Sequence, residues 1–94
     1  SRYMNRVTLV FDKTLSNLAG YEFGVKIYKE QVEGKIDFEQ KFEIVFPKEI
    51  RMVAASFVQG FFSDIVRKIG LKATEENLVI PNERLQMSVL KKLQ

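Results

Sequence analysis

Apolar residues occur along this chain in two repeating patterns. Three short runs rich in β-branched or aromatic side chains, at residues 7–11, 42–46 and 78–80, predict β-strands. Pro47 and Pro81 follow the second and third runs, and proline cannot donate a hydrogen bond to a neighbouring strand. The first pattern therefore predicts three short strands distributed over the whole chain.

The second pattern has the spacing of amphipathic helices. Apolar residues recur three and four positions apart in three segments, which predicts helices over residues 18–32, 54–69 and 82–94. Gly34 and Gly70 follow the first two segments, where glycine commonly ends a helix, and Asn82 is a good N-cap for the third. Residues 35–41 are mostly polar and fit either a loop or one edge of a hairpin.

The predicted elements alternate in the order β-α-β-α-β-α. Strands separated by helices of ten or more residues are typical of parallel sheets joined by right-handed crossovers. The sequence thus predicts a single small α/β domain over residues 1–94, with a mostly parallel sheet and packed helices. Its core is expected to include apolar residues from each predicted strand and from two helices: Leu9, Ile44, Val45, Phe61, Phe62, Ile65, Val79 and Leu90.

Two glycines lie four residues apart in the first predicted helix. Each of them, Gly20 and Gly24, costs about 1 kcal/mol of helix stability relative to alanine. We expect close approach of this helix to the sheet to compensate for that cost. The alternative is a ligand that approaches the helix backbone.

Composition narrows the environment of the domain. The chain contains no cysteine, which favours the cytoplasm, because small domains from oxidising compartments often depend on disulfides. No apolar run approaches the ~20 residues that span a bilayer, so no membrane association is expected. The start of the chain lacks the apolar core of a signal peptide, and residues 1–3 are interpreted as an expression scar ahead of a native Met4.

The charged residues favour a mixed surface over a nucleic-acid interface. Fifteen basic and twelve acidic residues give a net charge of +3, but the two signs alternate along the chain. Nucleic-acid-binding proteins usually concentrate their basic residues in a patch or stripe. A nucleic-acid accessory role is therefore an alternative, supported by the basic isoelectric point and by Lys91 and Lys92.

The residue types needed for most enzyme chemistry are missing from the sequence. There is no histidine and no cysteine, which removes the Ser-His and Cys-His nucleophile pairs and most zinc and iron sites. The spacing of Gly20 and Gly24 does not match a phosphate-binding loop. We therefore expect a binding role without a cofactor or metal rather than an enzyme, with a small ligand-binding domain as a further alternative.

The segment that joins the second strand to the second helix contains the candidate site. Parallel α/β sheets place their ligands at the carboxyl ends of strands, and this segment is expected there. Its small residues leave room for another surface to approach the start of the helix. Ser56 is suited to capping that helix, and the functional alternative is that Ser56 accepts a phosphate or contacts a partner.

The same segment resembles a known family. Residues 43–71, with the sequence EIVFPKEIRMVAASFVQGFFSDIVRKIGL, resemble the STAS-like family of bacterial domains of unknown function. In that family, a strand leads through a serine-rich turn and a phenylalanine into an amphipathic helix. The resemblance continues through Ile80, Pro81 and Asn82 and extends more weakly back to residues 20–32, so that it covers about three-quarters of the chain.

The resemblance implies a role in bacterial regulation. STAS domains are similar to anti-sigma-factor antagonists, which bind a kinase-like ATPase and are switched by phosphorylation of a serine at this helix. The sequence departs from the pattern twice, because Phe46 and Pro47 stand near the family's aspartate and Ala55 occupies the usual acceptor position. The implied partner-binding surface, with Ser56 as its phosphoacceptor, consists of Ala54, Ala55, Ser56, Phe57 and Gln59. The helical spacing of Phe57 and Phe61 favours a place in the core for Phe57 over partner contact.

Overall fold

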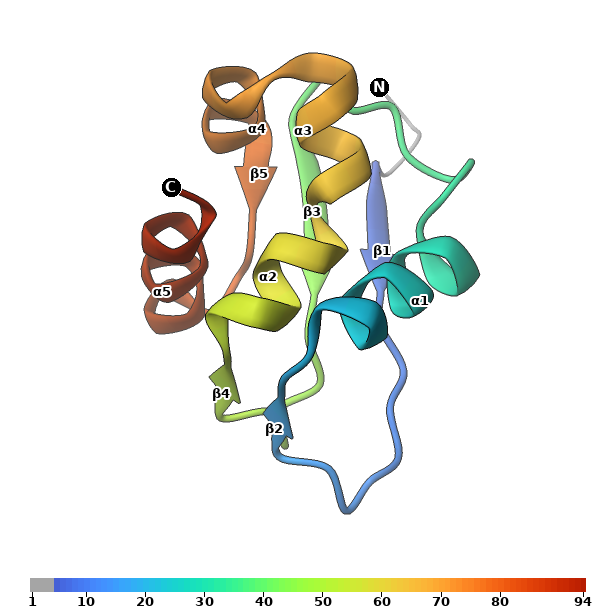
Figure 1. Cartoon of the computed structure of the whole chain (residues 1–94), viewed down its shortest axis with the longest axis vertical. Helices are drawn as coiled ribbons and strands as arrows, with labels where there is room; N and C mark the ends of the chain where they lie inside the picture. Colours follow the sequence, from blue (N-terminus) through green and yellow to red (C-terminus); the bar gives the residue numbers. More distant parts are fainter. Residues whose placement is uncertain (1–4) are drawn as a thin grey trace.

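Three parallel strands form the main sheet of the protein. In the computed structural model, which describes residues 5–94, the strands are β1 (Arg6–Thr8), β3 (Phe42–Val45) and β5 (Leu78–Val79), in the order β1-β3-β5 (Figure 1). The interpretation of residues 1–3 as an expression scar concerns residues outside this range. The prediction of a parallel sheet within an α/β fold is confirmed.

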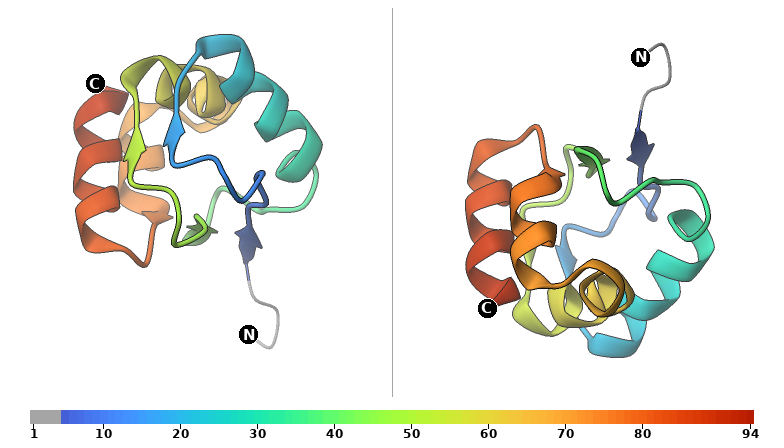
Figure 2. Two further views of the ribbon diagram at one scale, coloured as in Figure 1. Left: turned by 90° about the horizontal axis from the view of Figure 1, so that it is seen from below. Right: turned by 90° about the horizontal axis from the view of Figure 1, so that it is seen from above.

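The helices follow the strands in the predicted order, but two of them were not foreseen. The structure contains α1 (Tyr21–Gln31), α2 (Ala55–Phe61), α3 (Ser63–Ile69), α4 (Leu71–Asn77) and α5 (Glu83–Leu93). The chain moves across the sheet in one direction, and right-handed crossovers then place the connecting helices on the same face. Figure 2 shows α1, α2 and α3 together on one side of the strands.

Among the residues that the structure describes, no helix covers the opposite face of the sheet (Figure 2). Side chains alternate between the two faces of a strand. In β3, Phe42 and Ile44 face the helices and are buried, whereas Val45 points to the other face and is only half-buried. Val79, which pairs with Glu43 on this open face, is also half-buried. The prediction that Val45 and Val79 are core residues is therefore wrong in degree, because the helices cover one face.

A second, smaller parallel ladder precedes the helices. Strand β2 (Asn17–Leu18) pairs with β4 (Met52–Val53), and each leads within three residues into a helix. The backbone N–H of Ala54 donates to the carbonyl of Leu18 at 2.7 Å, which extends the ladder up to the start of α2. The chain thus contains two similar units, β1-β2-α1 and β3-β4-α2, that pack side by side.

The predicted helix over residues 54–69 is divided. The backbone of Phe62 leaves the helical conformation, and the Ser63 hydroxyl donates to the carbonyl of Gly60 at 2.9 Å. After Gly70, which has a positive φ of 88°, the chain turns directly into α4. Residues 35–41 form a loop, held to the start of β1 by hydrogen bonds from the Asn5 side chain.

Phenylalanine side chains dominate the core between the sheet and the helices. Phe61 contacts the rings of Phe57 and Phe62 at centroid distances of 5.6 and 4.8 Å, and all three are buried. The prediction of burial is confirmed for Leu9, Ile44, Phe61, Phe62 and Ile65, whereas Leu90 is half-buried. Within residues 5–94, no helix has the length and apolarity needed to cross a bilayer.

Gly24 allows a close contact, but its neighbour is a helix and not the sheet. A Cβ atom at Gly24 would lie 2.6 Å from the backbone nitrogen of Phe61. Gly60 makes the reciprocal contact, since a Cβ there would lie 3.0 Å from the Cα of Tyr21. Gly20 lies outside α1 as its N-cap residue, with a φ of 103° that favours glycine.

Candidate functional site

The starts of α1 and α2 lie side by side at one end of the molecule. The register of the small ladder pairs Leu18 with Val53, so strands β2 and β4 lead into α1 and α2 next to each other (Figure 1). The close packing of α1 on α2 through Gly24 and Gly60 fixes this arrangement. The candidate segment is therefore held on a rigid frame made from two parts of the sequence.

Ser56 does not cap α2. The N-cap residue is Ala54, which has an extended backbone and offers no capping side chain, and Ser56 is the second residue of the helix. Its Oγ atom accepts a hydrogen bond of 2.9 Å from the backbone N–H of Gly20. The predicted capping role is thus wrong, and the side chain instead joins the start of α2 to the start of α1.

Most of the predicted site residues lie at the surface. Ala55, Ser56 and Gln59 are exposed and Ala54 is half-buried. Phe57 is 0% exposed and packs against Phe61, so it belongs to the core and does not line a partner-binding surface. This is the place that its helical spacing favoured.

Two further exposed apolar residues lie beside this segment. Met52, in β4, and Tyr21, at the start of α1, each expose 51% of their surface. Tyr21 and Gln59 share the lining of a shallow pocket of about 140 Å³. We call the exposed residues of this region the junction surface: Tyr21, Met52, Ala55, Ser56 and Gln59.

The sequence carried no clear signal for Tyr21 and Met52. Tyr21 shares the helical spacing of core residues such as Tyr28, and Met52 lies in a two-residue strand that is too short to show a pattern. Their places depend on the contact between the two helix starts, which joins residues about 35 positions apart. Local periodicity cannot report such a contact.

Helix α5 supports the junction surface from the side. The Gln59 amide donates to the carbonyl of Lys92 at 2.6 Å, and the Lys92 ammonium donates to the carbonyl of Val53 at 2.7 Å. The guanidinium of Arg84 donates to the carbonyl of Arg51 at 3.1 Å. Positive charge from α5 thus lies next to the β4–α2 segment.

A separate polar cluster lies between α1 and α3. The Tyr28 hydroxyl donates to the Asp64 carboxylate at 2.7 Å, and Arg67 and Lys68 form ion pairs with the same carboxylate. Burial, followed by the bond to Asp64, raises the pKa of Tyr28, and the bond from Tyr28 lowers the pKa of Asp64 below its usual value. A groove of about 460 Å³ runs past this cluster. At neutral pH, Tyr28 is therefore protonated and Asp64 ionised, and the hydrogen bond between them joins α1 to α3.

Within residues 5–94, no three Asp or Glu side chains come together in an arrangement that could hold a metal ion. No protein-family model, curated protein or solved structure matches the chain, and the resemblance to STAS-like domains remains a prediction.

Proposed function

We propose that this chain is a non-catalytic protein-interaction module of a bacterial regulatory system. Its junction surface docks against a protein partner of the histidine-kinase-type ATPase class. The observation that carries the proposal is the exposure of Met52 and Tyr21 beside the small residues Ala55 and Ser56. Exposed apolar side chains on a rigid frame, next to small residues that permit close approach, are features of docking surfaces.

The small volume of the nearby pocket favours a protein partner over a small molecule. The pocket beside the junction surface holds about 140 Å³, well below the roughly 300–1,000 Å³ typical of ligand sites. A partner surface would instead lie across Ala55 and Ser56 and cover Met52. The apolar area covered would supply binding energy in proportion to its size.

Ser56 is the expected point of regulation. Its hydroxyl is exposed and accepts from Gly20, so a phosphate on Oγ would lie beside the N–H groups at the start of α1, where negative charge is tolerated. The same phosphate would add roughly −2 charge in the middle of an apolar docking surface and oppose binding. The proposed switch thus changes the interface and leaves the fold intact.

The test is calorimetric titration of the chain with the histidine-kinase-type ATPase encoded nearest to it. Wild type and Ser56→Ala should bind, and Ser56→Asp should bind at least about tenfold more weakly, as expected for a charge in a desolvated interface. Met52→Asp should weaken binding similarly, whereas Lys26→Asp, on an exposed helical position of α1 outside the junction surface, should not. Equal affinity of Ser56→Asp and wild type would contradict the switch, and absence of binding by wild type would contradict the choice of partner.

A further inference from the structure

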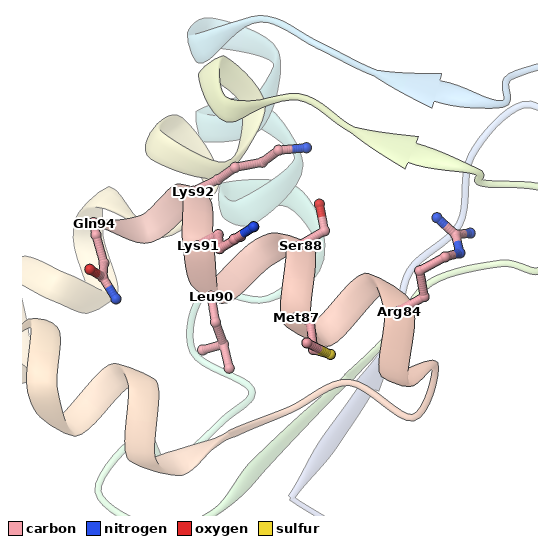
Figure 3. Close-up of a pocket in the computed structure, with 7 residues that line it drawn as sticks. All are labelled: Arg84, Met87, Ser88, Leu90, Lys91, Lys92 and Gln94. Carbon is pink, nitrogen blue, oxygen red and sulfur yellow. The ribbon is translucent and has the colours of Figure 1, made fainter.

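The outward surface of α5 combines apolar and basic side chains. A hollow of about 660 Å³ runs along it, lined by six residues of the helix and by Gln94, which follows the helix (Figure 3). Met87 is 70% exposed and Leu90 is half-buried, and Figure 3 shows both pointing to the same side of the helix. We call this the α5 surface, and define it by Arg84, Met87, Leu90, Lys91 and Lys92.

The charges of the α5 surface are of one sign. Arg84, Lys91 and Lys92 are basic, and none of the seven described lining residues is acidic. Glu83, the single acidic residue of the α5 sequence, does not contribute to the lining. An occupant with complementary chemistry would therefore carry negative charges on the side of its apolar stripe that meets Arg84, Lys91 and Lys92.

Hydrogen bonds hold two basic side chains of the α5 surface in place. Arg84 and Lys92 donate to the carbonyls of Arg51 and Val53, which holds their stems against the β4 segment. Their positions are set before any partner arrives, so less side-chain entropy is lost on binding. The apolar side chains Met87 and Leu90 are three residues apart, the spacing that matches one stripe of a second helix.

We infer that the α5 surface binds an acidic amphipathic helix of a protein partner. The apolar stripe of that helix covers Met87 and Leu90, and its acidic residues face Arg84, Lys91 and Lys92. A second copy of this chain fits poorly, since pairing two α5 surfaces brings basic residues together. Nucleic acid fits less well than an acidic helix, because a phosphate backbone would leave the exposed Met87 and the half-buried Leu90 uncovered.

This inference goes beyond the proposed docking at the junction surface and does not depend on it. The test uses two fluorescent peptides of identical composition, rich in leucine and glutamate, added to the full chain and followed by anisotropy. One peptide has its leucines on a single helical stripe, and the other has them distributed around the helix. The amphipathic peptide should bind at least about tenfold more tightly, because it alone can cover Met87 and Leu90 together.

Variants of the α5 surface identify the binding site. Met87→Ser and Lys91→Glu should each weaken binding of the amphipathic peptide about tenfold, and Lys26→Glu, an equal change of charge on α1, should leave it within about twofold. Ser56→Asp should also leave it unchanged, which separates this site from the junction surface. Circular dichroism melting of each variant confirms that the fold is retained.

Three results would overturn the inference. These are equal affinity for the two peptides, unchanged affinity in both Met87→Ser and Lys91→Glu, and a preference for duplex DNA or anionic lipid vesicles that is lost in Lys91→Glu. A concentration-dependent dimer in sedimentation that Lys91→Glu alters would also overturn it, since the surface would then bind a second copy.

Discussion

Gly24 in α1 and Gly60 in α2 bring the backbones of the two helices into contact. A Cβ atom on Gly24 would meet the backbone nitrogen of Phe61 at 2.6 Å, and one on Gly60 would meet the carbonyl carbon of Tyr21 at 2.8 Å. Both neighbours are backbone atoms, which cannot rotate away as the end of a side chain can. This contact sets the spacing of the helices and, with it, the place of the junction surface.

Alanine at either glycine should therefore destabilise the protein. We expect Gly24→Ala and Gly60→Ala each to lower the free energy of unfolding by about 1–3 kcal/mol, because overpacking exceeds the roughly 1 kcal/mol gained from helix propensity. Urea denaturation measures this change, with Lys26→Ala on the exposed side of α1 as a control within about 0.5 kcal/mol of wild type. A more stable Gly24→Ala would show that the helices can separate at little cost.

Phe61 should be among the most important core residues. It is 0% exposed and its ring lies against those of Phe57, Phe62 and Tyr28. Phe61→Ala should cost about 3–5 kcal/mol, since the cavity cannot close around so many fixed rings. The matched control is Met87→Ala, which removes a long side chain that is 70% exposed and should cost far less. A loss below about 1 kcal/mol for Phe61→Ala would contradict the assigned core.

Ser56 should contribute to stability through Gly20. Ser56→Ala removes the acceptor of the Gly20 N–H and should lower the free energy of unfolding by about 0.5–1.5 kcal/mol. Ser56→Asp keeps an acceptor at this position and adds a negative charge near the start of α1, so it should lose less. Thermal melting of both variants checks this order. If Ser56→Asp were the less stable of the two, the bond to Gly20 would not be what positions this side chain.

Asp64 should make the stability of the protein depend on acid pH. In the folded state, the hydrogen bond from Tyr28 and then that from Lys68 hold the pKa of Asp64 below its ordinary value of 3.8. Since the folded-state pKa lies below the unfolded-state value, this contribution is complete well above pH 3.8 and is lost as the pH falls through the folded-state pKa. In urea denaturation, Asp64→Asn should be less stable than wild type at neutral pH, and the difference should shrink in acid.

The control for this prediction is another carboxylate. Glu76→Gln changes an exposed acid on α4 and should remain close to wild type at both pH values. Tyr28→Phe removes the first donor to Asp64 and should weaken the dependence on acid pH. A difference between Asp64→Asn and wild type that stayed constant from neutral to acid pH would contradict the role given to its charge.

The sequence by itself determined the order of the main elements and most of the core. The strand runs at residues 7–11, 42–46 and 78–80 each overlap a strand, and the helical spacing after them is found in α1, α2, α3 and α5. These features depend on local periodicity, and burial of one face of each element follows from it. The phenylalanines at positions 57, 61 and 62 could be placed in the core for this reason.

Tertiary structure alone decided the candidate site. The ladder between β2 and β4 consists of two residues on each side, and its hydrogen bonds join segments about 35 residues apart. Local sequence patterns therefore cannot predict it. Because of the same contact, Ser56 accepts a hydrogen bond from the Gly20 N–H and does not cap α2 as predicted. The contact also brings Tyr21 beside Gln59. The half-exposure of Val45 and Val79 has a similar origin, because a strand pattern shows which residues share a face but not which face the helices cover.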